Sequence, residues 1–279
     1  MKDTIIQFLR QLSHETNNIR YANIAKKIKN CPFFTKKEIQ GEIKTVPNYC
    51  GNTFCPTCTE KKKIKGIATY YNLAKKISKQ TFFKNIIFKI PDIDQSKVKD
   101  TLDKATDAFA HLIRFFEGSK KIKHFNLSNL EYLGAIKVLN LTNNNDYVQI
   151  EINTLFFFNK PLNYQKDIKN SFSKNDTMLF SKFECLLQRI WCLLMMNVKV
   201  TKENIINIET MTNGRYIDGF LVHENSLTSI EDYFYNFNQI QFHDYKTFKS
   251  FYSALENKKK YTAYGIIKSQ QKDSCGIYE

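Results

Sequence analysis

The sequence lacks any apolar run long enough to span a bilayer, and residues 1–18 lack the apolar stretch and cleavage site of a signal peptide. We therefore expect a cytoplasmic protein without a membrane partner. Internal repeats and low-complexity linkers are absent as well, which argues against a repeat protein. With 42% hydrophobic and 14% aromatic residues among 279, the chain is expected to fold around a core.

Histidine is scarce, and its spacing nowhere matches a metal site. We interpret none of the five as a ligand: His14, His111, His124, His223 and His243. Disulfides are not expected either, because cytoplasmic thiols stay reduced. Two of the seven cysteines, Cys185 and Cys192, lie a heptad apart in an apolar stretch, which is typical of buried core thiols.

Acidic residues are too few to balance the basic ones, and the net charge is +15. Residues 1–100 hold 20 lysines and arginines against 8 acidic residues, whereas the remaining 179 residues hold 22 against 19. A basic front end favours a polyanionic partner, because lysines on phosphates release condensed counterions. A coding bias that enriches lysine over arginine is the alternative, but it explains the uneven placement less well.

Hydrophobic periodicity predicts an α+β protein, with an antiparallel sheet and helices on one face. Helices are expected at 4–30, 61–80, 96–117, 176–197 and 245–257, and strands at 85–90, 133–141, 147–158 and 205–210. Residues 31–60 contain proline, glycine and cysteine and are predicted to be loop-like. We expect a basic, cysteine-rich region at 1–80, followed by the α+β domain at 81–279.

Three cysteines fall within nine residues of this loop-like region: Cys50, Cys55 and Cys58. A C-x-x-C turn can present two sulfurs to one ion, and a structural zinc site needs a closed set of four soft ligands. Cys31 would complete that set. The alternative, free buried thiols, is disfavoured because no apolar pattern surrounds them. We therefore predict a structural Zn²⁺ ion held by these four residues.

Lysines crowd the helix that follows the cysteines, at Lys61, Lys62, Lys63 and Lys65. A metal site next to this helix would hold it in place, so we predict that these lysines contact DNA phosphates. A solvated helix face is the alternative, and it is the usual role of a charge run.

Polar and apolar residues alternate in the strand predicted at 147–158. Alternate residues share one face of a strand, so Gln149, Glu151 and Asn153 are expected to point together. The alternative is a strand with one solvated face, which is common in antiparallel sheets.

In this order, the segments resemble the rolling-circle plasmid replication initiators, the Rep proteins of the HUH endonuclease class. The cysteine pattern with its following basic stretch is the most specific match. The further matches are the strand 85–91, the strand led by Gly134, the strand 149–158, the helical LLQRIW at 186–191 and the segment 253–268. The resemblance covers nearly the whole chain from about residue 20, and it implies an HUH/RRM-like core.

The departures from that family lie at its catalytic site. Gln149, Glu151 and Asn153 stand where the family has histidines, and Asn140 stands where it has an acidic ligand. The resemblance thus implies a degenerate catalytic metal site at Asn140, Glu151 and Asn153. Oxygen donors of this kind suit Mg²⁺, with Mn²⁺ as the other candidate.

Tyr235 is the best match to the family's nucleophilic tyrosine, four residues after Glu231, and Tyr233 is the alternative. Asn238 stands where the family has a lysine. In the family, attack of this tyrosine on a DNA phosphate leaves a phosphotyrosyl intermediate and a free 3′-hydroxyl that primes replication.

Two functions therefore stay open, and with them the question of whether the chain is an enzyme. The first is an initiator that binds its plasmid origin, as duplex and single strand, and nicks it with Tyr235 while Glu151 holds Mg²⁺. The second is a DNA-binding relative without catalysis that acts in origin binding or regulation. A basic RNA-binding protein is a third interpretation. No small-molecule substrate is expected.

Overall fold

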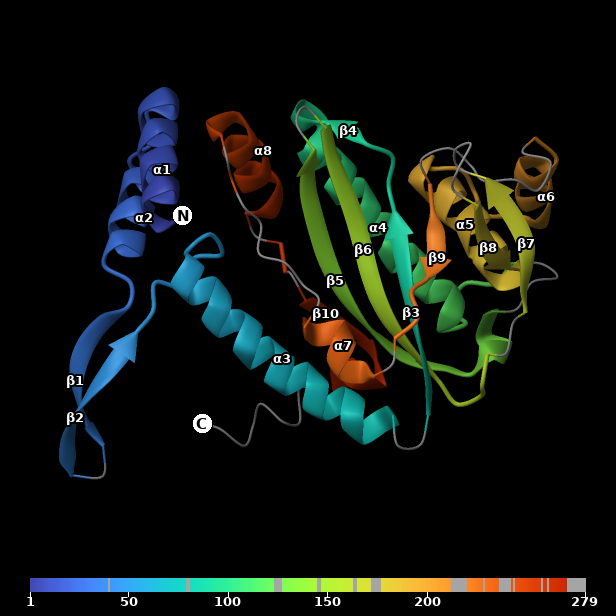
Figure 1. Cartoon of the computed structure of the whole chain (residues 1–279), viewed down its shortest axis with the longest axis horizontal. Helices are drawn as coiled ribbons and strands as arrows, with labels where there is room; N and C mark the ends of the chain where they lie inside the picture. Colours follow the sequence, from blue (N-terminus) through green and yellow to red (C-terminus); the bar gives the residue numbers. More distant parts are fainter. Residues whose placement is uncertain are drawn as a thin grey trace. The chain divides into compact units, whose positions relative to one another are not determined.

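The computed structural model describes residues 1–39, 41–78, 81–122, 127–144, 147–162, 165–171, 177–211, 220–227, 229–235, 242, 244–256, 258–259 and 261–269 (Figure 1). The chain forms two compact units, Met1–Ala68 with Gln239–Lys258, and Thr69–Asn238 with Lys259–Glu279. The sequence predicts one boundary, after residue 80. The first unit also includes a segment from near the C-terminal end.

The first unit combines helices with one β-hairpin. Its elements are α1 (Lys2–Thr16), α2 (Ile19–Lys29), β1 (Phe33–Ile39), β2 (Glu42–Asn48), the beginning of α3 (Pro56–Ser78) and α8 (Tyr245–Leu255). Asn17 adopts a left-handed conformation, with φ of 49°, and ends α1. The side chain of Asn18 then accepts a hydrogen bond from the backbone N–H of Arg20 and caps α2. The two asparagines together make the tight helix–helix turn.

Apolar and aromatic side chains form the core of this unit. Leu9 and Ile28 are fully buried between α1 and α2. The ring of Phe54 stacks on Tyr252 of α8 with 4.5 Å between centroids, and Phe8 of α1 contacts Phe248 at 5.4 Å. Such pairs stabilise by area burial together with their ring geometry.

The second unit is built on a six-stranded sheet in which every pairing is antiparallel. The strands run in the order β10 (Tyr261–Gly265), β5 (Tyr132–Asn144), β6 (Tyr147–Phe158), β3 (Phe82–Lys89), β9 (Val222–Glu224), and β4 (Ile93–Asp94) also pairs with β6. The remaining elements are α4 (Val98–Phe116), β7 (Lys166–Ser171), β8 (Thr177–Ser181), α5 (Lys182–Met195), α6 (Lys202–Met211), α7 (Ile230–Tyr235) and two 3₁₀ turns (Gln95–Lys97, Leu127–Leu130). The predicted antiparallel α+β fold is confirmed at this level.

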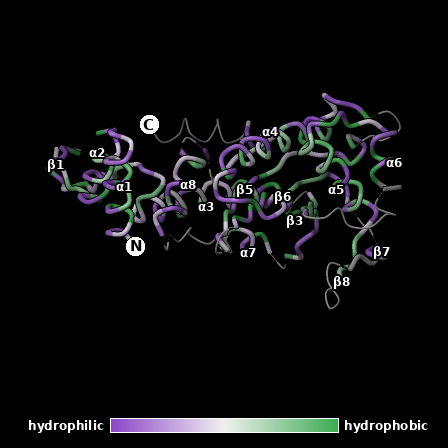
Figure 2. Tube along the Cα trace, turned by 90° about the horizontal axis from the view of Figure 1, so that it is seen from above, coloured by the Kyte–Doolittle hydropathy of each residue, from purple (hydrophilic) through white to green (hydrophobic). Residues whose placement is uncertain are grey.

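Helices contact both faces of this sheet, so the expectation of helices on one face is wrong. On one face, Phe88 of β3 contacts Phe109 of amphipathic α4 and Trp191 of α5, at 5.5 and 5.4 Å. The alternation of hydrophilic and hydrophobic residues along α4 is visible in Figure 2. On the other face, Tyr70 of α3 stacks on Tyr261 of β10 at 5.9 Å. Hydrophobic periodicity predicts the helix at 61–80 but does not show which face of the sheet it covers.

Three further elements differ from the sequence prediction. The loop-like region contains the hairpin β1–β2, which turns at Gly41 with φ of +79°. Residues 205–210, predicted as a strand from their isoleucines, lie in helix α6, whose first turn is capped by the Thr201 hydroxyl. The helix predicted from residue 176 begins at Lys182, because Ser181 and Glu184 form a capping box after strand β8.

No helix within the described ranges is long and apolar enough to cross a membrane.

Candidate metal centre and nucleic-acid interface

The four predicted cysteines come from four different places around the hairpin. Cys31 follows α2, Cys50 follows β2, Cys55 immediately precedes α3, and Cys58 lies in the first turn of α3. The hairpin therefore leaves from one ligand and returns to the next, and α3 begins at the other two.

The four sulfur atoms lie within 4.8 Å of one another. The Sγ of Cys58 is 3.5 Å from that of Cys31 and 3.4 Å from that of Cys50. Cys31, Cys55 and Cys58 are fully buried, and Cys50 is half-buried. Within the described part of the chain, no other group of three cysteine, histidine or carboxylate side chains is placed to hold a metal ion. This cluster could hold one.

Backbone N–H groups are directed at two of the sulfurs. The amide of Cys50 donates to Cys31 Sγ at 3.4 Å, and the amide of Gly51 donates to Cys58 Sγ at 3.2 Å. Burial raises the pKa of Cys31, but the Cys50 amide and the neighbouring thiols outweigh it, so the net pKa of this thiol is lowered. Burial raises the pKa of the Cys50 and Cys58 thiols. Burial therefore disfavours the thiolate form at Cys50 and Cys58, and a bound cation would favour it.

The predicted phosphate contacts are only partly described. Lys61 is exposed, and its Nζ lies 3.5 Å from the centre of the Tyr49 ring, next to the cysteine cluster. Lys65 is exposed, whereas the side chains of Lys62 and Lys63 lie outside the described residues. The first unit carries 16 lysines and arginines against 7 acidic residues, a net charge of +9 over 88 residues. The second unit has 26 against 20, a net charge of +6 over 191 residues.

The polar residues of β6 share one face of the sheet, as predicted. Gln149, Glu151 and Asn153 are half-buried, between fully buried Ile150 and Ile152. Asn140 of β5 lies directly opposite Glu151 in the pairing register. The predicted set is therefore gathered on the face away from Phe88 and α4, although its side chains do not form a metal-ligand group among the described residues.

An ion pair lies on this face. Strand β6 lies between β5 and β3, and Lys89 of β3 pairs with Glu151 as Asn140 of β5 does. The Nζ atom of Lys89 is 2.9 Å from Glu151 Oε1. Lys89 is not among the site residues that the sequence predicts. Its only signal is the period of β3, in which Asn85, Ile87 and Lys89 share a face. That period does not show which strand lies beside β3, so it cannot predict that Lys89 meets Glu151.

Helix α7 packs on the same polar face. The hydroxyl of Tyr233 donates to the backbone oxygens of Ile136 and Asn153, at 2.7 and 3.1 Å. Helix α4 covers the opposite face of the sheet at this position, since Nζ of Lys137, the neighbour of Ile136 on β5, lies over the Phe109 ring of α4. Burial raises the pKa of Tyr233 well above its ordinary value. Tyr233 is therefore unsuited to act as a nucleophile. Tyr235 ends α7, and its side chain lies outside the described residues.

Among the described residues, His223 is the histidine that lies on this face. It lies on β9 opposite Ile87, which in turn lies opposite Asn153 of β6. Burial lowers the pKa of this half-buried imidazole, and the charge of Lys89 lowers it further. His243 lies outside the described residues.

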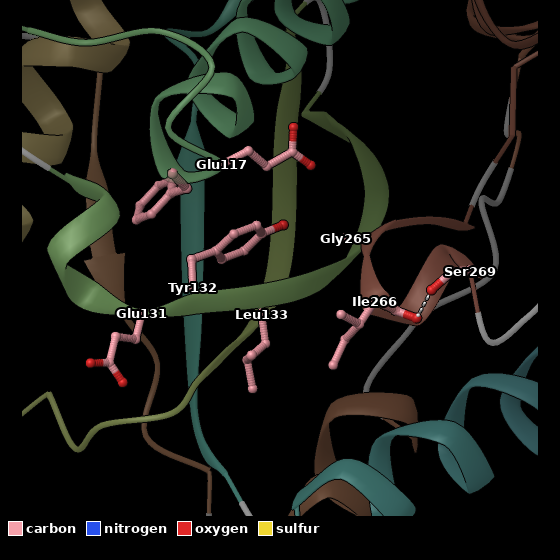
Figure 3. A pocket seen from close by; sticks show the side chains of 8 residues that line it. Glu117, Glu131, Tyr132, Leu133, Gly265, Ile266 and Ser269 are labelled. Atoms are coloured by element: carbon pink, nitrogen blue, oxygen red, sulfur yellow. Dashed lines mark hydrogen bonds between the residues drawn. The ribbon is translucent and has the colours of Figure 1, made fainter.

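A separate open hollow of about 450 Å³ lies beside the other end of β5 (Figure 3). It is lined by Glu117, Glu131 and the ring of Tyr132, whose buried hydroxyl has no hydrogen-bond partner among the described residues. Gly265 lies so close to Leu133 that a Cβ atom would be 2.2 Å from its carbonyl oxygen. None of the predicted site residues lines this hollow, and its carboxylates oppose a phosphate ligand.

Comparisons with protein-family models, with curated proteins and with solved structures find no match to this chain.

Proposed function

We propose that this protein binds the origin DNA of a plasmid as a replication initiator of the rolling-circle type, through its basic, metal-holding first unit. The observation that carries the proposal is the four-cysteine cluster at the base of the hairpin and at the start of α3. This cluster fixes the start of the basic helix α3 in the first unit, which carries more positive charge per residue than the second unit. Rigid presentation of lysines favours phosphate binding, because less side-chain and backbone freedom is lost on binding.

Zinc is the metal we assign to the cluster. Four thiolates are a soft donor set, and zinc–sulfur bonds of about 2.3 Å give a tetrahedron with edges of about 3.8 Å. The sulfur distances of 3.4 and 3.5 Å are close to that edge. A thiolate site of this kind also suits the reducing cytoplasm, where we place the protein.

Duplex binding and its dependence on salt test this proposal. We expect the full-length protein to shift a duplex carrying the sequences that flank its gene, and the affinity to fall steeply as salt rises. Replacing Lys61 and Lys65 together with alanine should weaken binding about tenfold, since two phosphate contacts are removed. The matched control replaces Lys97 and Lys99, two exposed lysines at the start of α4 in the second unit, and should bind as the wild type does.

Two outcomes would contradict the proposal. One is an equal loss of DNA affinity in both double variants, which would mean that binding depends on the total positive charge and not on where the lysines lie. The other is a stronger interaction with structured RNA than with duplex DNA at matched salt, which would favour the RNA-binding interpretation.

Strand nicking by Tyr235 is a second candidate function, favoured by one observation. Helix α7, which ends at Tyr235, packs on the sheet face that carries Glu151 and Asn140. A supercoiled plasmid incubated with the protein and Mg²⁺ or Mn²⁺, then run on a denaturing gel, would reveal a covalent adduct. The adduct should disappear in Tyr235→Phe and persist in Tyr245→Phe, whose hydroxyl contacts Glu15 in the first unit.

A further inference from the structure

The residues of the predicted catalytic metal site do not fit a divalent cation. Glu151 supplies the only carboxylate among Asn140, Glu151 and Asn153, and its Oε1 is already 2.9 Å from the ammonium of Lys89. The pair is neutral, so a cation at Glu151 would lie beside a positive charge and gain little from the carboxylate. The group that this face presents is the ammonium.

Lys89 is held firmly in the sheet at both of its backbone groups. Its N–H donates to Leu221 O at 2.7 Å, and its carbonyl accepts from the indole Nε1 of buried Trp191 at 3.2 Å. The side chain then leaves the backbone on the face opposite to Trp191, where Glu151 orients it. A lysine fixed in this way acts as a preorganised point charge.

Two amide side chains lie on the same face of the sheet as this ammonium. An ammonium has three N–H donors, and the contact with Glu151 occupies one of them. Asn140 lies opposite Glu151 on β5, and Gln149 precedes it by two residues on the same face of β6. Both are half-buried amides without a hydrogen-bond partner among the described residues. The face therefore combines one fixed positive charge with N–H donors. Phosphate oxygens accept hydrogen bonds from donors of this kind.

We propose that this sheet face binds a phosphate of single-stranded DNA through Lys89, with Asn140 and Gln149 as neutral donors and with no divalent cation. The proposal rests on the proposed DNA-binding function and assigns it a second site, for the single strand. The backbone contacts of Lys89 hold it in place, and the negative charge of its partner Glu151 weakens the contact of the ammonium with phosphate.

The test is binding of a fluorescein-labelled 12-residue oligothymidylate to the full-length protein, measured by anisotropy in metal-depleted buffer with and without added Mg²⁺. We expect equal affinity in both buffers. Lys89→Gln should weaken binding about tenfold, because a charge-assisted contact is lost, and Lys89→Arg should restore most of it. Glu151→Gln should bind as tightly as the wild type or more tightly, whereas a metal ligand at this position would make that variant the weakest.

Lys84→Gln is the matched control. Lys84 lies on the same strand and pairs with Glu224 at 2.7 Å, with 30% of its side chain exposed against 29% for Lys89. It points to the opposite face, so its loss should change the affinity less than twofold. Thermal unfolding of each variant verifies that it is folded.

Three results would overturn the proposal: Lys89→Gln binding as tightly as Lys84→Gln, affinity that requires Mg²⁺, or no binding of the oligothymidylate by the wild type. Each of these leaves the duplex-binding result of the first unit untouched. Failure of the proposed function would instead appear as loss of duplex binding specificity in that separate assay.

Discussion

The two places where the sequence suggests a metal are built in different ways. The cysteine cluster gathers four soft donors from residues 31–58, with sulfurs within 4.8 Å of one another. The sheet face gathers one carboxylate and two amides from β6 and a third amide from β5, and Lys89 of β3 neutralises the carboxylate. The first arrangement suits a cation and the second suits an anion, although the sequence predicts a metal at both.

This difference shows what a local pattern can and cannot encode. The cysteine ligands lie close in sequence, so their spacing alone specifies most of the site. The sheet site depends on which residue of β3 lies opposite Glu151, and that register is set by the packing of the whole sheet.

Cys58→Ser is expected to have the largest effect of the substitutions considered. Structural zinc in small sites contributes on the order of 10 kcal/mol of apparent folding energy, so loss of one ligand should release the metal and unfold the first unit. Metal analysis and limited proteolysis of the hairpin would report both. Cys192→Ala, at a buried cysteine of α5, should keep the metal. Retention of a full complement of metal by Cys58→Ser would show that the cluster is no metal site.

A smaller effect is expected from Tyr233→Phe on the sheet unit. The variant removes the donor to the oxygens of Ile136 and Asn153, and a buried bond of this kind contributes about 1–3 kcal/mol. Urea unfolding followed by Trp191 fluorescence would measure the loss. Tyr245→Phe breaks an exposed contact with Glu15 and should cost less than about 1 kcal/mol. Equal stability of the two variants would contradict the packing of α7 on this face.

The pKa of His223 tests whether the charge of Lys89 acts on the sheet face that carries Glu151. Burial, and then the charge of Lys89, lower its pKa below the ordinary 6.5, so the unfolded chain takes up the proton first as pH falls. The free energy of unfolding should therefore decrease as pH drops below about 6.5, and His223→Gln should flatten that dependence. By NMR, Lys89→Gln should raise the pKa of His223, whereas Lys84→Gln should not. If the pKa of His223 were unchanged in Lys89→Gln, the ammonium of Lys89 would not lie near the imidazole of His223.

The smallest expected effect is that of metal removal on the second unit. Trp191 is the only tryptophan, and it is fully buried between α5 and β3. The midpoint of urea unfolding seen by its fluorescence should change by less than about 0.5 kcal/mol after chelation, because the cysteine cluster belongs to the first unit. A large shift would mean that the two units unfold together.

Sequence periodicity predicted the long central strands and α4 because each buries a regular set of residues. It failed at β1–β2, where Phe33, Phe34 and Ile43 are exposed, so no alternation of burial marks the strands. It failed at α6 because isoleucines favour strands, while the Thr201 cap and packing against α5 select the helix. Local propensity is weak wherever tertiary contacts decide.

The candidate sites follow the same division. The cysteine set, Cys31 included, was predicted from spacing and is brought together as expected. The shared face of Gln149, Glu151 and Asn153 was predicted from the two-residue period. Lys89 was not, because it precedes Glu151 by many residues and meets it only through the pairing of β3 with β6. The burial of Tyr233 was also hidden, since it depends on where α7 packs.

The most direct test of the account is duplex DNA binding by the full-length protein before metal removal, after it, and after stoichiometric Zn²⁺ is restored. We expect strong, salt-sensitive binding that is lost with the metal and recovered with zinc. Binding that is unchanged in the metal-free protein would contradict it, because the cysteine cluster would then have no part in presenting the basic surface.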